Sequence, residues 1–164
     1  MIVLVLGGAR SGKSAYAERR AASLPKPISY VATACVDGDA DLAERVDEHR
    51  ARRPESWTTI EAAPDVPDVL LATRGTVVLD ALGPWVAAAP EFGVDTAELR
   101  DALAGRDGDT VVVSEEVGLG VHPSTAAGQQ FRDALGELNQ AVATVADEVV
   151  LVVAGRALRL EPAG

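Results

Sequence analysis

The stretch Gly7-Gly8-Ala9-Arg10-Ser11-Gly12-Lys13-Ser14 decides the fold, because it matches the phosphate-binding pattern G-x-x-x-x-G-K-[ST]. A short apolar run at residues 2–6 precedes it and predicts a buried strand, and residues 15–22 after it are rich in helix formers. In this setting, successive backbone N–H groups turn toward one anion at the positive end of a helix. Lys13 would reach the β- and γ-phosphates, and the Ser14 hydroxyl would ligate Mg²⁺. We therefore predict that the chain binds a nucleoside triphosphate.

The composition is that of a globular protein, with 164 residues, of which 48% are hydrophobic and 24% charged. A net charge of −10 argues against general binding to nucleic acid or to an anionic membrane. Cys35 is the single cysteine, which excludes an intrachain disulfide and a thiolate metal cluster. No apolar segment is long enough to span a bilayer, and no signal peptide is recognisable. We expect one cytoplasmic domain over residues 1–164.

Apolar runs rich in β-branched residues alternate with helical patterns along the chain. The runs predict strands at residues 2–6, 28–32, 76–79, 110–113 and 148–153, with a possible edge strand at 157–160. Helices are expected at residues 13–24, 40–53, 97–103 and 125–146, and residues 62–74 form a connection or a short helix. This order predicts an α/β fold of the P-loop NTPase type, with three layers, a mostly parallel central sheet and an antiparallel C-terminal edge.

Carboxylates close two of the predicted strands. Asp80 ends the run at 76–79, where a P-loop protein commonly places the residue that orders Mg²⁺; its alternative role is to cap a following helix. Glu115 and Glu116 close the run at 110–113, and one of the two is expected to face the site because neighbouring strand residues point in opposite directions. Ser14, Asp80 and Glu116 are the candidate metal ligands. Which of the carboxylates of Asp80, Glu115 and Glu116 orders the metal stays open.

A basic segment at residues 45–53 carries a histidine among arginines. On a helix, Arg45, His49 and Arg53 would share one face, with Arg52 beside them. Arginines would hold a triphosphate and disfavour protonation of the imidazole, which leaves a ring nitrogen free to attack phosphorus. Asp47 and Glu48 would favour protonation instead, so the sequence leaves the net effect on the imidazole open. Composition alone favours a solvated charged helix face.

Taken together, these stretches resemble the bifunctional adenosylcobinamide kinase and adenosylcobinamide-phosphate guanylyltransferase family, nearly from end to end. The resemblance rests on the P-loop, on His49-Arg50-Ala51-Arg52-Arg53-Pro54 followed by Trp57-Thr58-Thr59-Ile60-Glu61, and on Ser114-Glu115-Glu116-Val117-Gly118-Leu119-Gly120-Val121-His122-Pro123. The P-loop is generic, whereas the histidine signature and the later loop in this order are specific.

The resemblance implies two reactions. The γ-phosphate of ATP or GTP goes to the aminopropanol hydroxyl of adenosylcobinamide, and GMP from GTP then goes to that phosphate through a guanylylated histidine. By the same matching, His49 and Lys13 would be catalytic. The nucleotide contacts, Lys13 among them, would come from Gly7, Gly8, Ala9, Arg10, Ser11, Gly12, Lys13, Ser14, Ala32, Thr33, Ala34, Arg50, Ala51, Arg52, Arg53, Glu61 and Asp80. The resemblance also implies a homotrimer.

Two places depart from the family pattern. Ser114-Glu115 replaces a small-residue–Asn pair, and Ala81-Leu82-Gly83-Pro84-Trp85 replaces a run of the type Cys-Leu-Thr-Leu-Trp. The rival interpretations are a P-loop small-molecule kinase without a covalent nucleotide and a non-catalytic nucleotide-sensing subunit.

Overall fold

The computed structural model describes residues 1–34, 53–62 and 65–163. Within them, seven strands form one sheet in the order β3-β2-β4-β5-β1-β6-β7. The strands are β1 (Ile2–Gly7), β2 (Ile28–Ala32), β3 (Thr58–Glu61), β4 (Thr76–Asp80), β5 (Thr110–Glu115), β6 (Glu148–Val153) and β7 (Arg156–Leu160). All neighbours pair in parallel except β6 and β7, so the predicted parallel sheet with an antiparallel C-terminal edge is confirmed.

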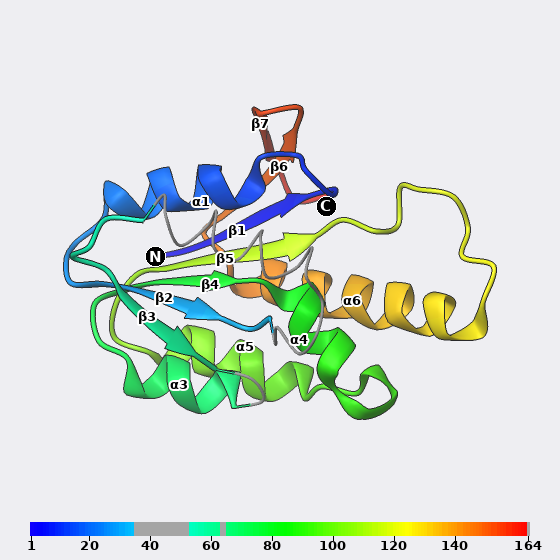
Figure 1. Ribbon diagram of the computed structural model, residues 1–164, viewed down its shortest axis with the longest axis horizontal. Helices are drawn as coiled ribbons and strands as arrows, with labels where there is room; N and C mark the ends of the chain where they lie inside the picture. The colour runs from blue at the N-terminus through cyan, green and yellow to red at the C-terminus, as the bar shows by residue number, and fades with distance from the viewer. Residues whose placement is uncertain (35–52, 63–64, 164) are drawn as a thin grey trace.

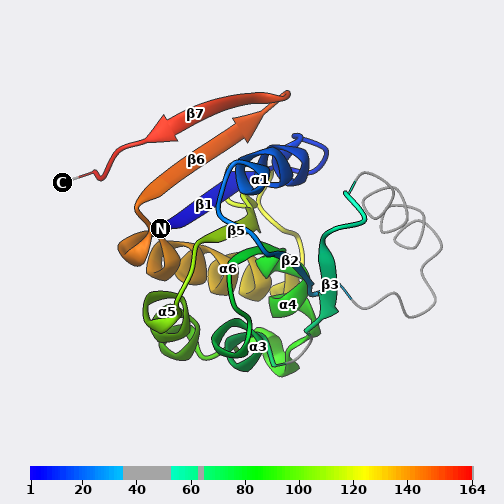
Figure 2. The same cartoon turned by 90° about the vertical axis from the view of Figure 1, so that its left-hand side faces the viewer.

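Helices cover both faces of the sheet (Figures 1 and 2). Helix α1 (Lys13–Ala22) lies on one face, and α3 (Val66–Ala72), α4 (Leu82–Ala88), α5 (Thr96–Gly105) and α6 (Ala126–Val145) lie on the other; η1 (Pro90–Phe92) is a short 3₁₀ turn. Successive side chains of each strand point to opposite faces of the sheet, so the hydrophobic core forms one cluster on each face. Val3 and Val5 pack toward α1, whereas Leu4 packs against the larger helical layer. The predicted three-layer fold is therefore confirmed.

The observed elements adjust the sequence-based boundaries. Residues 62–74 contain the short helix α3. Residues 58–61, for which no secondary structure was predicted, form the edge strand β3. Helix α4 accommodates Pro84 because Pro84 is the third residue of the helix. Backbone N–H groups in the first turn have no intrahelical partner, so the missing N–H of a proline costs no hydrogen bond there. The predicted helix at 40–53 falls almost entirely outside the described residues.

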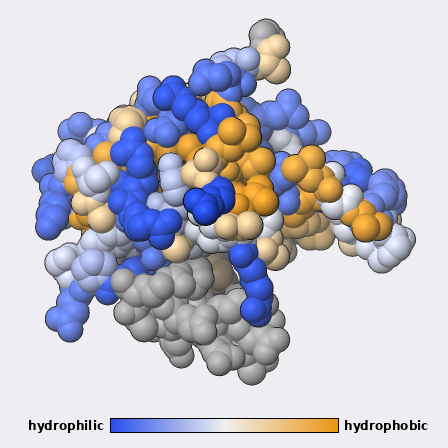
Figure 3. All heavy atoms as spheres, turned by 90° about the horizontal axis from the view of Figure 1, so that it is seen from above, coloured by the Kyte–Doolittle hydropathy of each residue, from blue (hydrophilic) through white to orange (hydrophobic). Residues whose placement is uncertain are grey.

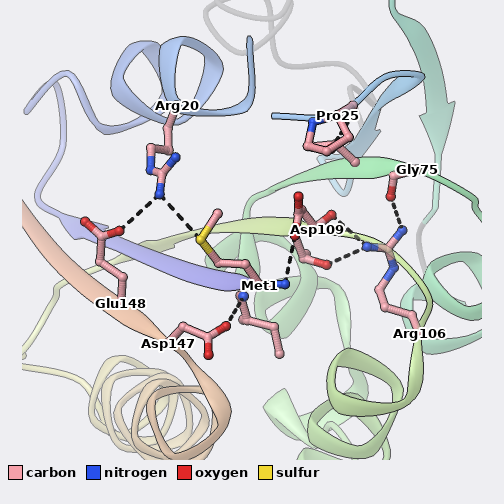
Figure 4. Close-up of polar contacts among 11 residues, drawn as sticks. Met1, Arg20, Pro25, Gly75, Arg106, Asp109, Asp147 and Glu148 are labelled. Carbon is pink, nitrogen blue, oxygen red and sulfur yellow. Dashed lines mark hydrogen bonds and ion pairs between the residues drawn. The ribbon is translucent and has the colours of Figure 1, made fainter. Parts of the chain in front are cut away.

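Polar contacts tie together the amino ends of the strands (Figure 4). The N-terminal ammonium of Met1 pairs with Asp109 at 2.8 Å, and the side chain of Asp147 accepts a hydrogen bond from the Ile2 N–H at 2.7 Å. Arg106 is buried and donates to the carbonyls of residues 70, 73, 75 and 109 and to the Thr110 hydroxyl. These contacts lie at the end of the sheet opposite the P-loop.

Candidate functional site

Parallel pairing brings the carboxyl ends of six strands, β1 to β6, to one edge of the sheet. In the strand register, Gly7 lies beside Glu115, and Ala32 lies between Asp80 and Glu61. Ligands of open α/β sheets bind outside this edge, where the loops that follow the strands converge. These strands therefore bring the P-loop, residues 32–34, Asp80 and Glu115 to one side of the molecule, as their positions after predicted strands suggested. Glu61 joins them at the end of β3, a strand that the sequence did not predict.

The P-loop has the backbone that its glycines predict. Gly12 adopts a left-handed φ of 93° immediately before α1, so that Lys13 and Ser14 begin the helix. A Cβ at Gly7 would lie 2.5 Å from Ser11 Oγ and 2.7 Å from the Val152 carbonyl oxygen, which leaves room only for glycine. The N–H of Gly155, in the turn after β6, donates to the Ser11 carbonyl at 2.8 Å. The C-terminal hairpin thus holds the loop in place.

Lys13 forms an ion pair with Glu115 across the top of the sheet. Its Nζ lies 3.3 Å from Glu115 Oε1, and the lysine side chain is only 12% exposed. The other carboxylate oxygen of Glu115 accepts the Gly83 N–H at 3.0 Å. Glu116 instead turns to its own loop, where its Oε1 accepts the Gly118 N–H at 2.7 Å. Of the two glutamates, Glu115 is the one beside the P-loop lysine.

Asp80 is anchored by a tyrosine on the neighbouring strand. The Tyr30 hydroxyl donates to Asp80 Oδ2 at 2.5 Å, and the Arg53 guanidinium stacks on the Tyr30 ring at 3.7 Å while donating to the Thr59 hydroxyl at 2.9 Å. Burial, and then the Asp80 carboxylate, raise the pKa of Tyr30 well above its ordinary value, so the phenol stays a neutral donor. The alternative that Asp80 caps α4 is wrong, because the N-cap of that helix is Ala81.

The segment after β2 is tied to the start of α4. The buried Thr33 hydroxyl donates to the Ala81 carbonyl and accepts the Ala81 N–H at 3.0 Å, while the Thr33 N–H donates to the Asp80 carbonyl. Thr33 therefore positions the backbone beside Asp80. The prediction that Ala32, Thr33, Ala34 and Glu61 contact a nucleotide stays a prediction.

The oxygen donors at this edge suit magnesium. Mg²⁺ is usually held by one or two protein oxygens together with substrate phosphates and water, and the Ser14 hydroxyl and the Asp80 carboxylate are donors of that kind. No group of three or more histidine, cysteine or acidic side chains forms a metal site within residues 1–34, 53–62 and 65–163. The metal role of Glu116 stays a prediction.

The predicted nucleophile and the three residues that follow it lie outside the described residues. This applies to His49, Arg50, Ala51 and Arg52, so only Arg53 of the basic segment can be placed. Arg53 stacks on the Tyr30 ring, and the Tyr30 hydroxyl donates to Asp80. Tyr30 therefore connects the end of the signature to the carboxylate on β4.

Four positioning residues were not found by sequence reasoning: Tyr30, Gly83, Asn139 and Gly155. The side chain of Asn139, on α6, donates to the Glu115 carbonyl at 3.1 Å and so fixes the end of β5. For Tyr30 a signal existed, since a polar-tipped aromatic inside a buried strand needs a partner. The contacts of the other three join segments far apart in the sequence, and no local pattern marks them.

Within the described part of the chain, no helix is both long and apolar enough to cross a membrane. Solved structures share the fold, and two of them serve as examples. The flagellar accessory protein FlaH from Methanocaldococcus jannaschii aligns with a TM-score of 0.51 at 14% identity, covering 98% of this chain and 77% of its own. An ATPase of a bacterial type III secretion system aligns with a TM-score of 0.53 at 13% identity, covering 92% and 50%. At these identities the likeness shows the P-loop NTPase fold alone.

Curated relatives match almost the whole chain. The bifunctional adenosylcobalamin biosynthesis protein CobP of Pseudomonas aeruginosa is 36% identical over 171 residues, covering 96% of each chain. The corresponding protein CobU of Salmonella typhimurium is 35% identical over 184 residues, covering 98% of this chain and 100% of its own. The family model described as cobinamide kinase / cobinamide phosphate guanyltransferase matches residues 3–160. The chain belongs to that family.

Proposed function

We propose that this chain phosphorylates adenosylcobinamide with ATP or GTP and then transfers GMP from GTP to the new phosphate, giving adenosylcobinamide-GDP for cobalamin biosynthesis. The observation that carries the proposal is the family match over residues 3–160, supported by relatives that align over nearly their whole length. The P-loop, Lys13 and Asp80 at one sheet edge are consistent with it.

In the kinase reaction, the P-loop N–H groups and Lys13 would hold the triphosphate with its γ-phosphorus toward the acceptor. The acceptor hydroxyl oxygen forms a bond to the γ-phosphorus as the bond to the β–γ bridging oxygen breaks. Magnesium, held by Ser14 and Asp80, would supply charge neutralisation on the phosphates. The anchoring of Asp80 by Tyr30 keeps that carboxylate at the end of β4.

In the guanylyltransferase reaction, a ring nitrogen of His49 would attack the α-phosphorus of GTP and release pyrophosphate. A phosphate oxygen of the phosphorylated acceptor would then attack the same phosphorus, and the P–N bond would break. Dividing the transfer into two displacements lets one site handle one nucleophile and one leaving group at a time. Arg50, Ala51, Arg52, Arg53 and Glu61 would contact the nucleotide, as the family pattern implies.

We further propose that the chain acts as one domain, in the cytoplasm where ATP and GTP are available, and as a homotrimer. Two exposed apolar side chains on the C-terminal hairpin, Val153 and Leu158, support an assembly. Figure 3 shows apolar side chains among polar ones on the face that carries this hairpin. Light scattering coupled to gel filtration measures the oligomeric state directly, and a monomeric mass would contradict the trimer.

The test of the proposed function is reconstitution with purified protein, adenosylcobinamide, Mg²⁺ and either ATP or GTP. Chromatography with mass detection should reveal adenosylcobinamide phosphate with either donor and adenosylcobinamide-GDP only with GTP. Lys13→Ala should lower phosphoryl transfer by at least about 100-fold, because the lysine neutralises charge on the transferred group. Formation of the phosphate without the GDP product would favour the plain kinase, and no product with either donor would favour the nucleotide-sensing subunit.

A further inference from the structure

Glu115 occupies a central place that the proposed chemistry has not used. It ends β5, the strand between the P-loop strand β1 and the Asp80 strand β4, and it lies beside Gly7 in the register. Its carboxylate is 3.3 Å from Lys13 Nζ. A bound triphosphate draws Lys13 to its β- and γ-phosphates, so the γ-phosphorus would come close to this carboxylate.

Both the carboxylate and the backbone of Glu115 are held in place. Oε2 accepts the Gly83 N–H at 3.0 Å and Oε1 pairs with Lys13, while the Glu115 backbone carbonyl accepts the Asn139 side-chain N–H at 3.1 Å. The side chain nevertheless remains 25% exposed, so a substrate can reach it. A carboxylate that is fixed in position and still accessible is suited to accept a proton.

Gly83 creates the space that this carboxylate occupies. A Cβ at residue 83 would lie 2.1 Å from Glu115 Oε2 and 2.9 Å from Cδ, so any larger residue displaces the carboxylate. Gly83 therefore leaves room for the carboxylate that its own N–H holds.

The two half-reactions differ in their need for a base. An alcohol must lose its proton as it attacks phosphorus, whereas a neutral imidazole attacks with a free lone pair. A phosphate monoester, the acceptor of GMP, is largely deprotonated at neutral pH. Phosphoryl transfer therefore gains from a general base, and neither step of guanylyl transfer needs one.

We propose that Glu115 is the proton acceptor of the kinase reaction, seated by Gly83. The acceptor hydroxyl oxygen bonds to the γ-phosphorus, the bond from that phosphorus to the β–γ bridging oxygen breaks, and the hydroxyl proton passes to the Glu115 carboxylate and then to solvent. This assignment rests on the proposed function and adds to it a residue that serves one of its two reactions.

The decisive variant is Glu115→Gln, assayed in both half-reactions with the full chain. The glutamine side-chain oxygen can still accept the Gly83 N–H, so the contact to α4 is kept while the base is lost. We expect the kcat for adenosylcobinamide phosphorylation to fall at least about 100-fold, the range of general-base catalysis. The rate of labelling from α-³²P-GTP and the Kd for GTP should stay within about threefold of wild type, since neither needs the base.

Glu148→Gln is the matched control. Glu148 also pairs with a cation, Arg20, at 3.3 Å, and its side chain is 23% exposed, but it lies at the opposite end of the sheet. Both half-reactions of this variant should match wild type. Gly83→Ala is the second test, because it displaces the carboxylate and keeps its charge; it should lower phosphorylation selectively.

The outcomes separate the two proposals. An equal loss of both half-reactions in Glu115→Gln would mean that the residue acts only through Lys13 and the nucleotide, and would overturn the assignment. Full kinase activity in Glu115→Gln would overturn it as well. Wild-type protein that performs neither half-reaction would overturn the proposed function itself, before any variant is compared.

Discussion

At the scale of single residues, Tyr30 connects two predicted parts of the site. Its hydroxyl donates to Asp80, and its ring lies under the guanidinium of Arg53. The side chain is 3% exposed, so the hydroxyl depends on Asp80 for its hydrogen bond in the interior. We infer that Tyr30 keeps Asp80 oriented.

Tyr30→Phe should lower the free energy of unfolding by about 1.5–3 kcal/mol, the range for a hydrogen bond to a charged group. The loss should depend on pH, because burial and Asp80 raise the pKa of Tyr30 above 10.0 in the folded chain. The folded chain therefore holds the phenolic proton more tightly, and that contribution is complete below about pH 10 and lost as the pH rises further. Urea unfolding at about pH 8 and about pH 11 measures this. A difference between the two proteins that is the same at both pH values would contradict it.

Gly7 and Gly8 provide a matched pair within the P-loop. A Cβ at Gly7 meets Ser11 Oγ and the Val152 carbonyl, whereas a Cβ at Gly8 has no heavy atom within 4 Å. Gly7→Ala should lower the free energy of unfolding without nucleotide by about 1–3 kcal/mol, the cost of overpacking, and Gly8→Ala by less than about 0.5 kcal/mol. Thermal unfolding of the nucleotide-free proteins measures both. Equal unfolding midpoints for the two variants would contradict the geometry of the loop.

At the scale of secondary-structure elements, Arg106 joins the helical layer to the sheet. Placed directly after α5, it uses all five of its N–H donors on carbonyls and a hydroxyl from the end of α3, the α3–β4 connection and the start of β5. The pKa of Arg106 is lowered, because the effect of burial outweighs the opposite effect of the nearby Asp109 and Asp107 carboxylates. Its position at the far end of the sheet from Lys13 indicates a structural role.

Arg106→Met should lower the free energy of unfolding by about 3 kcal/mol or more, because it leaves several buried acceptors without donors. Arg100→Met is the control: Arg100 lies on α5, is 43% exposed and pairs only with its neighbour Asp101 among the described contacts. Its effect should be within about 0.5 kcal/mol. Urea unfolding followed by circular dichroism measures both variants, and similar losses would show that the Arg106 contacts add little.

At the scale of the whole molecule, much of the fold could be predicted from the sequence. Six strands and their mostly parallel pairing followed from apolar β-branched runs alternating with helical patterns, because strands covered on both faces need apolar residues throughout. The edge strand β3 was missed since its residues are largely exposed and polar. Helix α3 was left open because Pro67 also fits a connection; in the structure it stands in the first turn.

The site was predictable where local motifs define it and not where distant segments meet. The P-loop and Asp80 follow from a motif and from a strand end, so both could be read from the chain. The choice between Glu115 and Glu116 could not, because it depends on Lys13 and Gly83, which approach only in the folded sheet. The contact between Gly155 and the P-loop likewise depends on β6 pairing with β1.

The central claim is that one chain carries a kinase and a histidine-dependent guanylyltransferase. Intact-protein mass spectrometry after incubation with GTP and Mg²⁺, with pyrophosphatase present, tests it most directly. The account predicts a mass increase of one GMP that is acid-labile, absent from His49→Ala and retained in Glu115→Gln. Binding of GTP without any adduct in the wild-type protein would contradict the covalent mechanism and leave a plain P-loop kinase.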